Sequence, residues 1–290
     1  MLPEFLTDLA AGFPFDWWQV LLILLAGVAA GLINTIVGSG TLVTFPVLVT
    51  MGVPPVTASM SNAMGLIAGN LTGAWHYRHE LRGVGRTLLK LLPCSALGGV
   101  LGAWLLLHLP EEVFGYAAPA LIVVALAFVV LQPRLQAVVR RRKDAQAAAA
   151  AAAAAARGLT PRPIDPDRAP QPASLYVLVL LAGVYGGYFV AAQGVLLLGI
   201  LGVFLLASLQ AANAAKVVLV AAVNIVAATS YVLFALDRIN WWAVLLIALS
   251  STVGAWAGAK IGRRLSPVAL RTVIVVLGTV ALVSMVSELL

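Results

Sequence analysis

Charged residues and cysteine are both scarce in this sequence of 290 residues. Asp, Glu, Lys and Arg make up only 10% of the chain, and 62% of the residues are hydrophobic, whereas soluble domains are about one quarter charged. Cys94 is the single cysteine, which excludes an intrachain disulfide and argues against a metal cluster. Apolar runs of roughly 20 residues recur throughout, as in helices that cross a bilayer. The composition therefore predicts an all-α, polytopic membrane protein.

Basic residues are absent ahead of the first apolar run, where a signal peptide would have its basic region, so we expect a retained helix. Of the 18 Lys and Arg residues, 16 fall within 78–90, 134–168 and 260–271. This clustering is typical of cytoplasmic loops and not of a nucleic-acid surface. We therefore expect a lipid bilayer and no nucleic acid as partners, with both termini outside.

Carboxylates are absent from the middle of every apolar run. All eleven Asp and Glu residues lie in tails, in loops or at segment ends. An intramembrane enzyme would need clustered carboxylates, a nucleophile–base pair or a metal at membrane depth. His76 and His79 have no further ligands that would complete a zinc site. We predict no enzyme activity, no metal and no cofactor.

Two sequence words recur in both halves of the chain, in the same order. Leu-Leu-Ala-Gly-Val stands at 24–28 and again at 180–184, an offset of 156 residues, and two following glycines repeat at that offset. Gly-Ala-Trp at 102–104 returns at 254–256, at an offset of 152. A hydrophobic chain built twice is typical of transporters made of two structural repeats, with the binding site where the repeats meet.

Ten apolar segments are expected, five in each half, with 41–52 and 196–208 shorter than the rest. Basic loops on one side of the membrane require an odd number of crossings per half, so the second half is inverted. The predicted domains are a first repeat (1–132), a cytoplasmic Ala/Pro-rich linker (133–173) and an inverted second repeat (174–290). Eight full crossings with two re-entrant pieces remain an alternative, because about 12 residues are too few for an upright span. The longer segments are expected at 17–37, 57–75, 87–108, 113–132, 174–193, 210–235, 240–260 and 268–289.

The linker contains an alanine run at 147–156 and a proline-rich piece after it. Alanine favours a helix projecting from the membrane, whereas the proline-rich piece should be extended. We interpret the linker as a tether. The alternative is a transport-inactive sensor or scaffold that signals through it.

A glycine-containing break, Gly38-Ser39-Gly40-Thr41, follows the first helix, and Gln193-Gly194 is its counterpart in the second half. Glycine lets the backbone unwind, and we expect Ser39 or Thr41 to cap the helix that follows. A helix start inside the membrane presents N–H groups and a positive dipole end, which suit an anion. The alternative is a kink needed only for close helix packing.

The third segment of each half carries polar residues. Asn213, Lys216 and Asn224 share one helix face, and we expect them to oppose a glycine face in the first half, leaving room for a small solute. The first-half candidates are Ser61, Asn62 and Asn70.

Lys216 is the only basic residue far from a predicted membrane boundary. An ionisable group at that depth is a functional candidate, and without a buried carboxylate its charge favours an anionic partner. The alternative is a side chain that snorkels to the headgroups.

Several of these features together resemble one family. They are Pro46 after the glycine break, Ala58-x-x-x-Asn62, the run from Gly73 to Leu81, and Ala212-Asn213-Ala214-Ala215-Lys216. The chain resembles the TauE/SafE sulfite exporter (TSUP) family over nearly its whole length outside the linker. The resemblance implies alternating-access transport of a small sulfur-containing anion, such as sulfite, sulfoacetate or another organosulfonate, across a bacterial inner membrane. One departure is Ser39, where the family often has a run of glycines.

Overall fold

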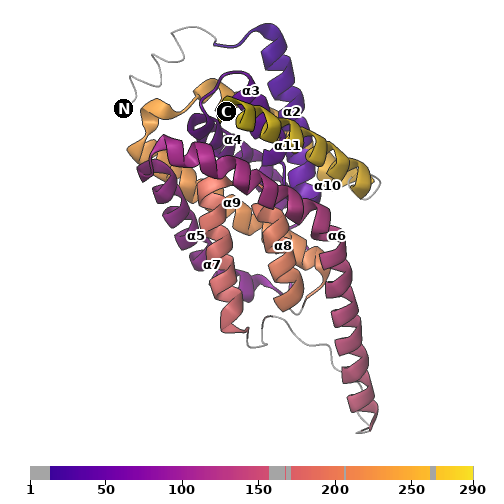
Figure 1. Cartoon of the computed structure of the whole chain (residues 1–290). Helices are drawn as coiled ribbons and strands as arrows, with labels where there is room; N and C mark the ends of the chain where they lie inside the picture. Colours follow the sequence, from indigo (N-terminus) through magenta and orange to yellow (C-terminus); the bar gives the residue numbers. More distant parts are fainter. Residues whose placement is uncertain (1–13, 157–166, 168–170, 206, 262–265, 290) are drawn as a thin grey trace.

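Helices account for almost all of the part of the chain that the structure describes. The computed structural model describes residues 14–156, 167, 171–205, 207–261 and 266–289. The elements are α2 (Trp17–Ile36), α3 (Thr41–Thr50), α4 (Pro55–His76), α5 (Gly85–His108), α6 (Glu111–Ala156), α7 (Ala173–Phe189), α8 (Gln193–Phe204), α9 (Leu209–Phe234), the 3₁₀ turn η1 (Leu236–Arg238), α10 (Trp241–Ile261) and α11 (Pro267–Leu289) (Figure 1). No strand occurs within these residues, so the all-α prediction is confirmed.

The ten helices correspond one to one with the ten predicted segments. Among the described residues, α2, α5, α6, α9, α10 and α11 are long and apolar enough to cross a membrane. The predicted short segments are α3 and α8, with 10 and 12 residues. Helix α6 continues through the alanine run to Ala156, as the helix propensity of alanine led us to expect. The prediction of a polytopic membrane protein is confirmed.

Packing between the helices follows a pseudo-two-fold pattern. Helices α2–α6 of the first half correspond to α7–α11 of the second. The contact between α2 and α10 is therefore equivalent to the contact between α7 and α5, and the contact between α4 and α10 is equivalent to the contact between α9 and α5. Likewise, α3 packs on α11 as α8 packs on α6. Two contacts, α4 with α9 and α6 with α11, join helices that are equivalent to each other. These contacts therefore lie on the pseudo-symmetry axis. Each repeat thus packs largely against the other repeat.

The helices that carry the duplicated sequence words pack against each other at those words. A Cβ on Gly254 would collide with the carbonyl oxygen of Val28, and a Cβ on Gly102 with that of Val184. Helices α10 and α5 therefore each lie on the Leu-Leu-Ala-Gly-Val helix of the opposite half. Small residues allow this close backbone approach, as in other helix pairs within membranes.

The two halves run in opposite directions. Gly27 lies against Ser250 and Gly31 against Ala255, so α2 and α10 are parallel, and the equivalent glycines show that α7 and α5 are parallel. In Figure 1, α2 enters the bundle from the top and α7 from the bottom. The structure therefore consists of two inverted repeats.

Residues from all three basic stretches, or next to them, gather at one end of the bundle. His76, Gln136 and Lys260 line one cavity there. Elsewhere, the loop before α10 contributes Arg238, which forms an ion pair with Glu111 at the start of α6. This grouping agrees with the positive-inside prediction.

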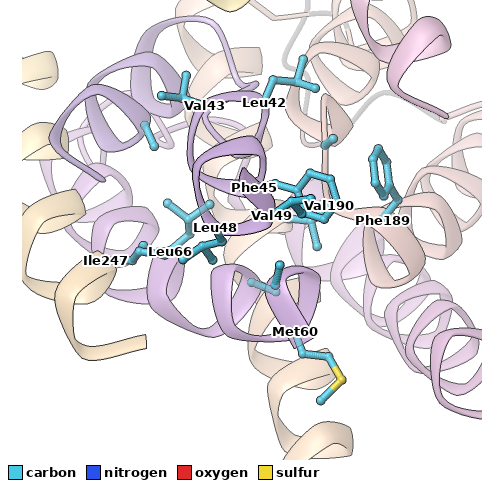
Figure 2. Close-up of a cluster of buried hydrophobic side chains, with 14 of the residues drawn as sticks. Leu42, Val43, Phe45, Leu48, Val49, Met60, Leu66, Phe189, Val190 and Ile247 are labelled. Carbon is cyan, nitrogen blue, oxygen red and sulfur yellow. The ribbon is translucent and has the colours of Figure 1, made fainter. Parts of the chain in front are cut away.

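The short helix α3 is enclosed by both halves. Figure 2 shows Phe45 of α3 facing Phe189 of the second half, with ring centroids 5.5 Å apart in an edge-to-face arrangement. Leu48 faces Leu66 and Ile247 on the other side. Broken helices are tolerated at membrane depth only where protein surrounds them. The surrounding protein thus encloses α3, which is too short to cross the membrane by itself.

Candidate functional site

The two helix breaks touch each other at the centre of the bundle. A Cβ on Gly38 would lie 2.8 Å from the carbonyl carbon of Gly194, and one on Gly194 would lie 2.5 Å from the carbonyl oxygen of Gly38. Gly38 also has φ of +100°, a conformation that side chains disfavour. Because the two glycines are equivalent and in contact, the pseudo-two-fold axis passes between them. The two breaks, which are counterparts in the sequence, are therefore in direct contact in the structure.

The second break is strained. Val190 (φ 61°) and Ala192 (φ 57°) are the non-glycine residues with positive φ in the described part of the chain. A β-branched residue in this region is an outlier, and such strain concentrates at sites of binding or switching. The break between α7 and α8 therefore holds a conformation that its own residues disfavour.

The predicted side-chain caps are wrong. Helix α3 has Gly40 as its N-cap and α8 has Ala192, and neither makes a side-chain cap hydrogen bond. Ser39 points its Oγ into the protein, where that atom is buried without a hydrogen-bond partner among the described residues. Both helices begin next to the touching glycines, with the N–H groups of their first turns directed there. Gly40 takes the N-cap position between Ser39 and Thr41, and Thr41 Oγ1 accepts a hydrogen bond from Asn62 instead.

Buried polar side chains without partners occur at both breaks and on the crossing helices α4 and α9. Ser39, Asn70, Gln193 and Asn224 are each at most 4% exposed. Within the described chain, Ser39 Oγ, Asn70 Nδ2 and both polar side-chain atoms of Gln193 and Asn224 make no hydrogen bond. Native proteins pair nearly all such atoms, so each exception needs an explanation. Desolvating them without a partner is unfavourable, and a bound polar ligand would remove that penalty.

Asn70 and Asn224 are symmetry equivalents. Gly69 of α4 meets Ser251, and Val223 of α9 meets Gly99 in the equivalent contact of the other half. Asn70 follows Gly69 as Asn224 follows Val223. Helices α4 and α9 pack on each other at the axis, so the two amides form a pair related by pseudo-symmetry.

Lys216 and Asn213 bind the C-terminal end of α2. Lys216 is 1% exposed, and its Nζ donates a 3.1 Å hydrogen bond to the carbonyl oxygen of Asn34. Asn213 Nδ2 donates to the carbonyl oxygen of Thr35 at 3.4 Å. The side chain of Lys216 thus does not snorkel to the surface. A helix C-terminus favours a cation, and no carboxylate pairs with Lys216 among the described residues.

Three predicted site residues make packing contacts instead. Asn62 donates to Thr41 Oγ1 at 3.3 Å and accepts a hydrogen bond from Thr44, which joins α4 to α3. Ser61 Oγ accepts the backbone N–H of Asn240 at 2.9 Å. These bonds position α3 but leave few free donors for a ligand.

The expectation of an open space beside the glycine face of α4 is also wrong. A Cβ on Gly65 would lie 2.7 Å from Ile247 Cβ, and one on Gly69 2.8 Å from Ser251 Oγ. Helix α10 therefore fills that face. The periodicity of one helix cannot show which neighbour covers it.

A cavity of about 460 Å³ lies between the two halves at the basic end. Ile36, Leu198, Glu80 and Lys260 are among its lining residues. Asn213 is the predicted site residue that lines it, and its Oδ1 is buried without a hydrogen-bond partner in the described chain. Because Ile36 is two residues before Gly38, the cavity extends from the basic end toward the crossing.

Sequence reasoning missed two residues that contact the break. Asn34 Nδ2 donates to Asn70 Oδ1, and Gln132 Nε2 donates to the carbonyl oxygen of Val37 at 3.2 Å. A polar side chain inside an apolar helix is the signal that could have identified each of them. Both are isolated amides that lie outside the glycine breaks and outside the polar faces of the third segments.

Comparisons with known proteins agree with this architecture. A family model described as "Sulfite exporter TauE/SafE" matches residues 23–285. A curated relative from Sinorhizobium sp, "Probable membrane transporter protein ORF9", is 26% identical over 113 residues, which cover 39% of this chain and 43% of the relative. The chain thus matches less than half the length of that relative. No solved structure matches the chain.

Proposed function

Because the chain belongs to the sulfite exporter TauE/SafE family, we propose that it is a secondary transporter of a small sulfur-containing anion such as sulfite, sulfoacetate or another organosulfonate. The observation that supports this most directly is the set of buried, unpartnered polar atoms around the crossing of the two breaks. Inverted-repeat transporters bind their substrates at such broken helices near the membrane midplane. The membrane is the bacterial inner membrane in this proposal.

The bound anion would lie beside the touching glycines. Ser39, Asn70, Gln193 and Asn224 supply hydrogen-bond donors to its oxygens, and the starts of α3 and α8 supply N–H groups and positive dipole ends. Lys216 adds a buried, full positive charge near the end of α2. Sulfite and sulfonate oxygens accept hydrogen bonds from several directions, which fits donors that come from both halves.

Transport would exchange the roles of the two halves. The cavity at the basic end is the cytoplasmic vestibule in this proposal, with Asn213 at its inner wall. The second half, being an inverted copy, forms the matching vestibule on the opposite side when the bundle rocks about the crossing. Both termini would then lie outside and the linker inside.

Thermal stability of the purified protein tests the substrate class. Sulfite, thiosulfate, sulfoacetate and isethionate are added separately, and taurine is the matched control because it carries an ammonium group where isethionate has a hydroxyl. A ligand at 100 times its dissociation constant stabilises by about 2.7 kcal/mol, or several degrees for a chain of this size. We expect that shift from at least one anion and a smaller shift from taurine. No shift from any anion would contradict the proposal.

Cysteine labelling tests the direction of the vestibule. In a Cys94→Ser background, Asn213→Cys is expected to react with a membrane-impermeant maleimide added from the cytoplasmic side, because Asn213 lines the open cavity. Asn224→Cys is the control and should remain unlabelled, since that position is fully buried. Labelling is measured in inside-out and right-side-out vesicles. Faster reaction of Asn213→Cys from the outside would reverse the proposed orientation.

A further inference from the structure

A second cavity lies between α6 and α11, apart from the central crossing. Its volume is about 450 Å³, and its charged lining residues are Arg140, Arg141, Asp144 and Arg271. Three guanidinium groups and one carboxylate give the lining a net positive charge. Guanidinium groups bind phosphate oxygens in paired hydrogen bonds. The cavity therefore has the chemistry of a phosphate site.

The lining of this cavity spans the change from apolar to basic residues along α6, which is expected at the headgroup layer of a membrane. The apolar part of α6 ends near Pro133, which lines the cavity, and the basic residues of α6 follow directly. Leu135, Val138 and Val268 are exposed apolar side chains on the same two helices. Hydrocarbon chains would contact these side chains while a headgroup enters the cavity. Basic pockets between membrane helices on the cytoplasmic side are where anionic lipid headgroups bind.

Arg271 connects this cavity to the central break through two hydrogen bonds. Its Nε donates to Gln132 Oε1 at 3.3 Å. The Nε2 of Gln132 donates to the carbonyl oxygen of Val37 at 3.2 Å. Gln132 is only 3% exposed, and Val37 directly precedes Gly38. A ligand that holds Arg271 in place therefore also holds, through Gln132, the carbonyl group of Val37 at the α2–α3 break.

We propose that the cavity between α6 and α11 binds the phosphate headgroup of an anionic phospholipid, which steadies the α2–α3 break through Arg271 and Gln132. The guanidinium Nη groups of Arg271 bind the phosphate, since its Nε is used by Gln132. Arg140 and Arg141 complete the site from α6. This inference is independent of which solute the protein transports.

The binding test compares melting temperatures in nanodiscs of phosphatidylcholine with and without 20–30% phosphatidylglycerol, about the level needed to occupy a lipid site. We expect phosphatidylglycerol to raise the melting temperature of the native chain by about 5 °C. The double variant Arg140→Gln/Arg141→Gln should lose most of this shift. Arg142→Gln is the matched control, since Arg142 is the next residue of α6 and does not line the cavity.

Two outcomes would overturn the binding assignment. One is an equal loss of the shift in Arg142→Gln, which would mean that general surface charge is responsible. The other is the same stabilisation by inorganic phosphate in pure phosphatidylcholine nanodiscs, which would mean that the site takes a free anion and not a lipid. Both readouts use binding alone, so they are separate from any failure of the transport proposal.

Hydrogen exchange tests the connection to the break. Phosphatidylglycerol should slow exchange of the backbone amides in 38–41 about tenfold in the native chain, as for a local opening that becomes less populated. Gln132→Leu should keep the lipid-dependent melting shift but lose the slower exchange. Gln132→Met is used in the same way if the leucine variant does not fold. Slower exchange that persists in the folded variant would overturn the proposed route through Gln132.

Discussion

Replacement of Lys216 by methionine is expected to abolish anion transport while the bundle stays folded. The proposed site contains one full positive charge, and Lys216 supplies it from within the membrane. Removal of that charge takes away the attraction that offsets desolvation of the anion. We expect at least a tenfold fall in transport rate, equivalent to about 1.4 kcal/mol in the barrier.

Stability should change little in Lys216→Met because two effects oppose each other. The carbonyl oxygen of Asn34 loses a charge-assisted hydrogen bond, which is about 1.5–3 kcal/mol of destabilisation. Removal of a buried ammonium without a carboxylate partner in the described chain relieves a desolvation penalty of several kcal/mol. Methionine has nearly the length of lysine and fills the same space. The melting temperature should therefore stay within a few degrees of that of the native protein.

The measurement is sulfite efflux from proteoliposomes, with the melting temperature determined on the same preparation. Lys90→Met is the matched control, because Lys90 lies on the exposed face of α5. It should transport at the native rate. Native transport by a folded Lys216→Met variant would remove Lys216 from the mechanism, and unfolding of the variant would assign it to stability.

Replacement of Gly38 by alanine is expected to destabilise the protein strongly. A positive φ disfavours any side chain by about 1–2 kcal/mol. The new methyl group would also lie 2.8 Å from the backbone of Gly194, and overpacking of this kind is about 1–3 kcal/mol of destabilisation. The neighbouring atoms are backbone and cannot rotate away. We therefore expect a total loss of about 2–5 kcal/mol, measured by reversible unfolding in mixed micelles.

Gly52→Ala is the control that separates the two contributions. Gly52 has φ of +82°, similar to that of Gly38, but a Cβ there would have no atom within 4 Å. It should show the conformational penalty alone. The difference between the two variants therefore measures the contact between the breaks. Equal destabilisation by both changes would mean that the glycines do not need to touch.

Hydropathy was sufficient for the ten segments, and the duplicated words divided them into two repeats. Within a bilayer each helix satisfies its own backbone hydrogen bonds, so local composition decides where it forms. The offsets between duplicated words and the grouping of basic loops were equally visible, and the structure contains both.

Contacts between distant residues could not be inferred in this way. Two of these features join separate helices: the hydrogen bond from Lys216 to α2 and the connection from Arg271 to Val37. The equivalence of Asn70 with Asn224 likewise depends on how α4 and α9 pack. The predicted side-chain caps of α3 and the predicted space beside the glycine face of α4 were wrong for the same reason. Periodicity describes one helix at a time, whereas close packing depends on which backbone the inverted copy presents to it. Amino-acid order thus accounts for the helices and their duplication, and the assembly of the two copies accounts for the site between them.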